Sequence, residues 1–143
     1  TYVALHANHT REFTPAAREA CARIVDAGIP MLSQTVLLKG VNDDIDTLAQ
    51  LMRGFVETRI KPYYLHHADL APGTSHFRLT VESGQDLVRQ LRDRISGLAQ
   101  PYYVIDIPGG VSKALASPAD VETEDGRIRL RGRDGDWRPY DGL

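Results

Sequence analysis

Short apolar runs alternate along the chain with longer segments in which apolar residues recur every three or four positions. The runs are rich in β-branched and aromatic side chains, as buried strands are, and they span residues 2–5, 31–38, 60–65 and 102–107. The intervening segments have the spacing of amphipathic helices and span residues 15–28, 45–58 and about 81–98. This alternation predicts an α/β fold with parallel strands, and four such units would make half of a TIM-type βα barrel.

The expected ends of these elements follow from capping residues and turn residues. Thr14 before Pro15 predicts the start of the first helix, and Asn42 or Asp43 is expected to cap the second. The tail from Val121 alternates apolar and polar residues around two Asp-Gly pairs, which predicts a small C-terminal β-hairpin. We therefore expect a βα unit over residues 1–116 and a tail with a β-hairpin over residues 117–143.

Composition narrows the class of protein. The chain has 143 residues, of which 42% are hydrophobic and 25% charged, as in a globular domain. The net charge of −2 gives no support for a nucleic-acid partner, and no apolar run approaches the roughly 20 residues that cross a bilayer. Cys21 is the only cysteine, which excludes internal disulfides and favours a reducing cytoplasm. A start at Thr1, directly at a strand-like run, suggests a piece of a longer protein.

The stretch YYVIDIPGGVSK, residues 102–113, carries the clearest candidate chemistry. Asp106 leaves the end of a buried strand, Gly109 and Gly110 allow a ligand to approach the backbone closely, and Lys113 follows. A lysine held between desolvating walls can become a nucleophile toward a carbonyl and form a Schiff base. The alternative is a glycine turn that carries a solvated lysine.

Other polar residues follow the predicted strands at the ends where ligands bind in parallel α/β folds. The two histidines of HANH could ligate a metal or act as hydrogen-bonded structural groups, and Gln34 could be satisfied in the core or face a ligand. Asp69 and Asp106 could be caps or solvated loop acids, or together they could hold the ammonium of an amine-bearing substrate. At least one of the adjacent His66 and His67 should lie at the surface. The full set is His6, Asn8, His9, Gln34, His66, His67, Asp69, Asp106 and Lys113.

Four segments, in order, carry a family resemblance: HANHTREF, SQTVLLKGVNDD, KPYYLHHADLAPGTSHFR and YVIDIPGGVSK. With them the chain resembles the C-terminal part of the lysine 2,3-aminomutases, which are radical S-adenosylmethionine enzymes that also use pyridoxal phosphate. The resemblance implies that residues 1–116 are the C-terminal half of a radical SAM βα barrel. It implies that Lys113 binds pyridoxal phosphate, with His66, Gly109 and Gly110 beside this cofactor. It places His6 and Gln34 near S-adenosylmethionine, and Asp69 and Asp106 on the substrate ammonium.

The implied reaction is migration of the 2-amino group of L-lysine to carbon 3, which gives β-lysine. The residues depart from the family pattern in several places. The CxxxCxxC motif for the 4Fe-4S cluster is absent, so the chain alone should be inactive. The loop is PGGVSK where many members have PGGGGK, and His66 stands where a family tyrosine lies beside pyridoxal phosphate. The cysteines of a structural zinc site are also missing, so no metal site is expected.

Two alternatives share this pattern. The first is the related aminomutase that makes β-lysine for attachment to a translation factor. The second is a half-barrel binding module without catalysis.

A half barrel should expose sheet edges and apolar surface, so we expect self-association into a homo-oligomer.

Overall fold

The computed structural model describes residues 1–107, 112–116, 121–132 and 135–140. The predicted loop glycines Gly109 and Gly110 lie outside the described residues. No helix within the described part of the chain is long and apolar enough to cross a membrane.

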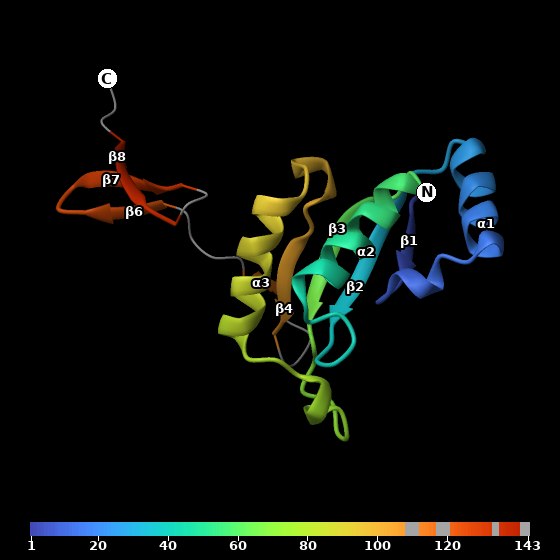
Figure 1. Ribbon diagram of the computed structural model, residues 1–143, viewed down its shortest axis with the longest axis horizontal. Helices are drawn as coiled ribbons and strands as arrows, with labels where there is room; N and C mark the ends of the chain where they lie inside the picture. The colour runs from blue at the N-terminus through green and yellow to red at the C-terminus, as the bar shows by residue number, and fades with distance from the viewer. Residues whose placement is uncertain (108–111, 117–120, 133–134, 141–143) are drawn as a thin grey trace.

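The larger of two sheets has five strands in the order β1-β2-β3-β4-β5 (Figure 1). The first four are parallel neighbours, each joined to the next by a segment that contains a helix, as the sequence predicts. These strands are β1 (Val3–His6), β2 (Met31–Leu37), β3 (Lys61–His67) and β4 (Tyr102–Asp106). The helices are α1 (Pro15–Asp26), α2 (Ile45–Glu57) and α3 (Val81–Arg94), with short 3₁₀ turns at Thr10–Glu12, Ser75–Phe77 and Gly97–Ala99.

The fifth strand, β5 (Lys113–Leu115), pairs antiparallel with β4, so the sheet is mostly but not wholly parallel. The sequence analysis expected a loop here. Three residues are too few to display an alternating pattern, and only the pairing with Val104, Ile105 and Asp106 defines the strand.

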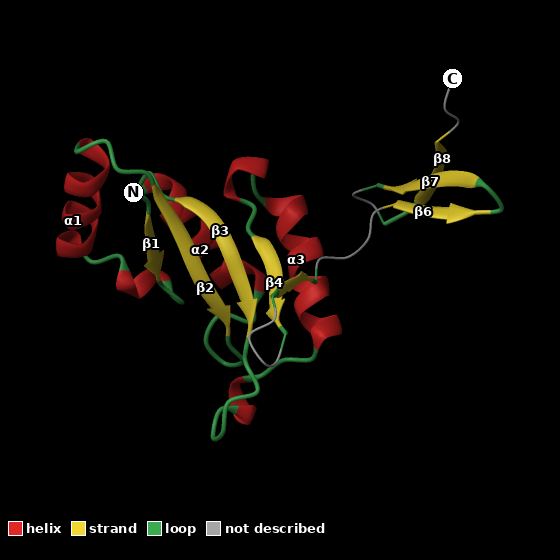
Figure 2. Cartoon of the chain, turned by 180° about the vertical axis from the view of Figure 1, so that it is seen from behind, coloured by secondary structure: helices red, strands yellow, loops and turns green. Residues whose placement is uncertain are grey.

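Helices α2 and α3 lie against one face of the sheet, and Figure 2 shows the strands in front of them from the other side. Alternate strand residues on the covered face join the helices in one core, while the intervening residues point to the uncovered face. The core contains Met31, Leu37, Leu65 and Tyr103 from the strands and Leu48, Leu51, Met52, Phe55, Leu87 and Leu91 from the helices.

Side-chain caps fix where the three long helices begin. The Thr14 hydroxyl accepts a hydrogen bond from the amide of Ala17 at the start of α1. The Thr80 hydroxyl accepts one from the amide of Ser83 at the start of α3. Helix α2 is capped by Asp44, not by the predicted Asn42 or Asp43. Asn42 is instead fully buried, where it accepts from one backbone amide and donates to two carbonyls.

The C-terminal segment forms a separate antiparallel sheet in the order β6-β7-β8. The predicted hairpin is confirmed as β6 and β7, which turn at Asp125 and Gly126 with φ of 50° and 76°. A third strand that the sequence analysis did not anticipate pairs with β7. The strands are β6 (Val121–Glu124), β7 (Arg127–Arg131) and β8 (Trp137–Tyr140).

Candidate active site

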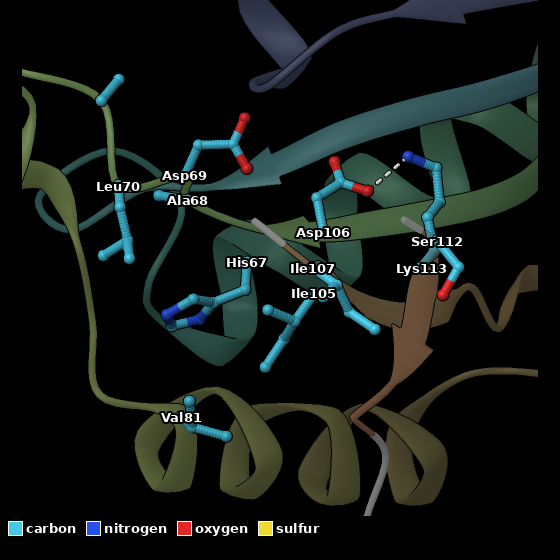
Figure 3. Close-up of a pocket in the computed structure, with 11 residues that line it drawn as sticks. His67, Ala68, Asp69, Leu70, Val81, Ile105, Asp106, Ile107, Ser112 and Lys113 are labelled. Carbon is cyan, nitrogen blue, oxygen red and sulfur yellow. Dashed lines mark hydrogen bonds and ion pairs between the residues drawn. The ribbon is translucent and has the colours of Figure 1, made fainter. Parts of the chain in front are cut away.

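A short ion pair joins β4 to β5 at the end of the sheet. Asp106, the last residue of β4, lies directly opposite Lys113, the first residue of β5, and Oδ1 is 2.5 Å from the lysine Nζ (Figure 3). The hydrogen bond from Lys113 is the main cause that lowers the pKa of Asp106, which therefore stays a carboxylate. Both side chains are about one-third exposed, so a ligand can reach the pair.

Backbone hydrogen bonds on either side hold this pairing in register. The amide of Ile107 donates to the carbonyl of Ser112 at 2.9 Å, and the amide of Ala116 donates to Tyr103 at 2.8 Å. Lys113 is thus presented by a strand and paired with an acid. It does not stand between the desolvating walls that the sequence analysis considered.

His66 lies on the neighbouring strand β3, on the same face as this pair. Its Nδ1 is 3.6 Å from Asp106 Oδ2, and 15% of its side chain is exposed. Burial is the main cause that lowers the pKa of His66, followed by Lys113, whereas the charges of Asp106 and Asp69 raise it. His66 is therefore a neutral imidazole at neutral pH, within electrostatic range of both acids and the lysine.

Tyr64 is a site residue that the sequence analysis missed. The lysine Nζ lies 5.9 Å from its ring centroid, a cation–π distance, and the ring meets His66 edge-on at 5.6 Å. The missed signal was the period of two along β3, which places Tyr64 and His66 on one face. The predicted strand ended at Leu65, so this relation was not drawn.

A pocket of about 920 Å³ opens beside the ion pair. Asp69, in the loop after β3, contributes a second carboxylate near the rim that carries Asp106 and Lys113, while Val81 and Ile105 form an apolar wall (Figure 3). Arg78 anchors this loop by donating to the backbone carbonyl of Asp69 at 2.7 Å and to that of Ala68. The lining residues are His67, Ala68, Asp69, Leu70, Ala71, Val81, Ile105, Asp106, Ile107, Ser112 and Lys113.

His67 points to the opposite face of β3 from His66. Its Nδ1 is 2.8 Å from the hydroxyl of Tyr103, which is fully buried and whose pKa burial raises to about 12. Both histidines are thus partly buried, and each imidazole has a polar neighbour on its own face. Burial, and then Arg78, lower the pKa of His67.

His6 and Gln34 are paired across β1 and β2 on the uncovered face. The alternation along β2 directs Gln34 away from the helix-covered core, and its partly buried side chain makes no hydrogen bond to another described residue. His6 Nε2 lies 3.2 Å from Asn8 Oδ1 and contributes to the electrostatic environment of His66. Both residues are thus on the face that carries the ion pair.

The remaining polar residues of the HANH segment form hydrogen bonds within the loop that follows β1. His9 Nδ1 accepts from the amide of Arg11, and the carboxylate of Glu12 accepts from the amides of Asn8 and His9. Asn8 Oδ1 also accepts from Val36 in β2. The described residues contain no cluster of three side chains able to hold a metal ion.

Comparison with known proteins shows which enzymes the chain is similar to. No family model matches the chain. The chain is 40% identical over 131 residues to the L-lysine 2,3-aminomutase of Fusobacterium nucleatum, a match that covers 91% of this chain and 31% of that enzyme. The chain is a homologue of the lysine 2,3-aminomutases.

Other aminomutases and one solved structure extend the comparison. The L-lysine 2,3-aminomutase of Clostridium subterminale is 37% identical over 131 residues, which are 91% of this chain and 32% of that enzyme. The glutamate 2,3-aminomutase of Clostridioides difficile is 36% identical over 117 residues, or 82% of this chain and 28% of that enzyme. A radical SAM methyltransferase from Sphaerobacter thermophilus shares the fold with a TM-score of 0.58 and 20% identity, over 82% of this chain and 37% of its own. The chain spans about a third of the length of its aminomutase relatives.

The cysteine content of this aminomutase homologue limits which cofactors its residues can hold. Iron–sulfur clusters of the 4Fe-4S type are bound by several cysteine thiolates. Cys21 is the only cysteine of the chain and is buried on α1, where it packs in the core. The residues present therefore do not fit a cluster site.

Proposed function

We propose that this chain is part of an enzyme that moves the 2-amino group of L-lysine to carbon 3. The observation that carries the proposal is the Lys113–Asp106 pair at the mouth of a pocket that also contains Asp69. One reachable amine and two carboxylates are what a carbonyl cofactor and an amine-bearing substrate require. The names of the relatives at 37–42% identity agree with this reaction.

Pyridoxal phosphate fits the residues at the pair. Lys113 is reachable and would hold the cofactor through its amine, and the rings of Tyr64 and His66 lie beside that amine. When bound, pyridoxal phosphate would supply a conjugated ring that stabilises unpaired electron density while nitrogen migrates. Asp106, which pairs with the amine, would orient Lys113 toward the pocket.

The acidic pair supports lysine as the substrate. Asp69 and Asp106 would hold the side-chain ammonium of lysine, because a cation that leaves water needs opposite charge nearby. A substrate fixed at its far end keeps its reacting carbons at one distance from the attacking radical. Glutamate carries a carboxylate at this end, which the two aspartates would repel, so lysine is favoured over the substrate named for the Clostridioides difficile relative.

S-adenosylmethionine would bind near His6 and Gln34 on the uncovered face and supply the radical. The 4Fe-4S cluster that cleaves it would have to be held by cysteines outside this chain, because Cys21 is buried in the core. We therefore expect the chain to be inactive alone.

We also infer that the sheet is half of a βα barrel. Consecutive parallel strands are direct neighbours, and crossovers of the usual right hand then put every helix on the same side, as in a barrel. In a doubly wound sheet the strand order reverses and helices cover both faces. The uncovered face would become the barrel interior, where the polar residues of the site already lie.

A non-catalytic half-barrel module is the second candidate, and loss of the cluster segment from the natural gene would favour it. The gene discriminates the two: a CxxxCxxC segment in the same reading frame upstream means an enzyme, and its absence means a module. The aminomutase that serves translation-factor modification would share this site. Its distinguishing assay is activity on free L-lysine in the complete enzyme.

Absorbance with pyridoxal phosphate, before and after borohydride reduction, tests the assignment of Lys113. We expect an absorbance band to the red of the free protein, and covalent label on Lys113 that is lost in Lys113→Ala. Lys39→Ala is the matched control, because Lys39 is an exposed lysine away from the pair. Label spread equally over Lys39, Lys61 and Lys113 would refute a specific cofactor site.

A further inference from the structure

Asp106 has two oxygens and two different neighbours. Its Oδ1 holds the amine of Lys113 at 2.5 Å, and its Oδ2 faces His66 Nδ1 at 3.6 Å. The first distance is a hydrogen bond and the second is slightly too long for one. The carboxylate is thus committed to the lysine while the imidazole stands beside it.

The groups around His66 come from every neighbouring element. Lys113 on β5 opposes a proton on the imidazole, as does His6 on β1, whereas Asp106 on β4 and Asp69 in the loop after β3 favour it. Tyr64, two residues earlier on β3, packs edge-on against the ring, and the register neighbours Val36 and Val104 are apolar. A proton on His66 would therefore be attracted mainly by Asp106 and Asp69.

We propose that His66 is a positioning residue that determines whether Asp106 holds Lys113. With a neutral imidazole, Asp106 binds the lysine amine. With a protonated imidazole, a second cation competes for the same carboxylate, and Lys113 is released toward the pocket. The inference deepens the proposed function, because it concerns the lysine assigned there to pyridoxal phosphate.

The order of titration makes this competition workable. The pKa of Asp106 is lowered mainly by its hydrogen bond with Lys113, so the carboxylate remains charged when His66 takes up a proton. The pKa of His66 is itself lowered, mainly by burial, so the exchange occurs on the acid side of an ordinary histidine titration. Above that range His66 is neutral and does not compete with Lys113 for Asp106.

Reductive methylation with formaldehyde and cyanoborohydride measures the release of Lys113 without any cofactor. The labelling of Lys113 is expressed relative to Lys39 in the same chain, which cancels the general effect of pH on amines. We expect this ratio to rise about threefold or more as the pH falls from about 8 to about 5. The ratio should stay flat in His66→Gln, and it should be high and flat in Asp106→Asn.

A ratio that changes identically in the native chain and in His66→Gln would overturn the proposal, as would a flat ratio in the native chain. A second measurement covers the case in which His66→Gln does not fold. The imidazole Cε1–H resonance of His66, followed by NMR, should titrate at higher pH in Lys113→Met, because a competing cation is gone. An unmoved midpoint refutes the coupling.

Neither measurement uses pyridoxal phosphate. A chain that fails to bind this cofactor but shows the His66-dependent ratio would refute the proposed function and support the positioning role of His66. Specific cofactor labelling with a ratio independent of His66 would do the reverse.

Discussion

Replacing Gly84 by alanine should destabilise the fold, although alanine is the better helix former. Gly84 lies in the first turns of α3, directly over the ring of Tyr103. An added Cβ would lie 2.0 Å from the tyrosine hydroxyl oxygen and 2.6 Å from Cζ. Tyr103 is fully buried and its hydroxyl is bonded to His67, so the ring cannot move aside without breaking that contact.

The change in the free energy of unfolding is the sum of one stabilising and two destabilising effects. Alanine in a helix interior gains up to about 1 kcal/mol over glycine. Overpacking of a dense core costs about 1–3 kcal/mol, and loss of the Tyr103–His67 hydrogen bond costs about 1 kcal/mol more. A contact this short belongs at the upper end of that range, so the free energy of unfolding should fall by about 3 kcal/mol.

Urea denaturation followed by circular dichroism measures this change. With a slope of about 2 kcal/mol per molar, the midpoint should fall by about 1.5 M. Gly97→Ala is the matched control, because nothing lies within 4 Å of its added Cβ and its stability should be unchanged or slightly higher. Gly54→Ala should be intermediate, since its Cβ would meet the edge of Phe13 at 3.0 Å. A Gly84→Ala protein as stable as the native chain would refute the packing argument.

Three further predictions concern the loops, a helix cap and the exposed edge. Asn42→Ala should lower the free energy of unfolding by about 3 kcal/mol, because it leaves three partly buried backbone groups without their side-chain partner. Asp43→Asn should change the free energy of unfolding little, and equal midpoints of the two variants in urea would contradict this. Asp44→Ala should cost about 1 kcal/mol at neutral pH. Hydrogen bonds from Thr47 lower the pKa of Asp44, so the contribution of this cap to stability is present above the unfolded-state pKa and is lost as the pH falls through the folded-state pKa. Asp44→Asn should keep the cap without this acid dependence. Urea denaturation at several pH values below neutral checks both expectations. The native chain should self-associate with concentration in sedimentation velocity, and Ala4→Lys, which puts charge on the uncovered face of β1, should reduce this association; a monodisperse native monomer at high concentration would contradict it.

The sequence predicted the architecture because the relevant signals are local. Apolar periodicity located four parallel strands and three helices, and a Thr-Pro pair marked the start of α1. The N-cap of α2 was misplaced by one or two residues because three adjacent residues, Asn42, Asp43 and Asp44, are all good caps. Only the buried position of Asn42 between two loops removes it from that role.

The site was predicted less completely, because its contacts depend on pairing between strands. Asp106 and Lys113 were both identified, but their direct opposition depends on the pairing of β5 with β4. A strand of three residues is too short to show a recognisable pattern in the sequence. Tyr64 was missed because the predicted strand ended before His66 and so hid their common face. Positions after the predicted strands singled out His6 and Gln34, and the register of β1 and β2 then places them side by side on one face.

The antiparallel β5 gives the larger sheet two unlike ends. A three-residue strand covers part of β4 and offers little backbone for a further partner, whereas β1 presents one side of a four-residue strand that pairs only with β2 among the described strands. Two copies that join edge to edge would therefore meet β1 to β1 across a twofold axis. Such an assembly ends as a dimer, because each copy has only one sheet edge that can pair with another copy. A sheet with two equal edges would instead propagate into fibres.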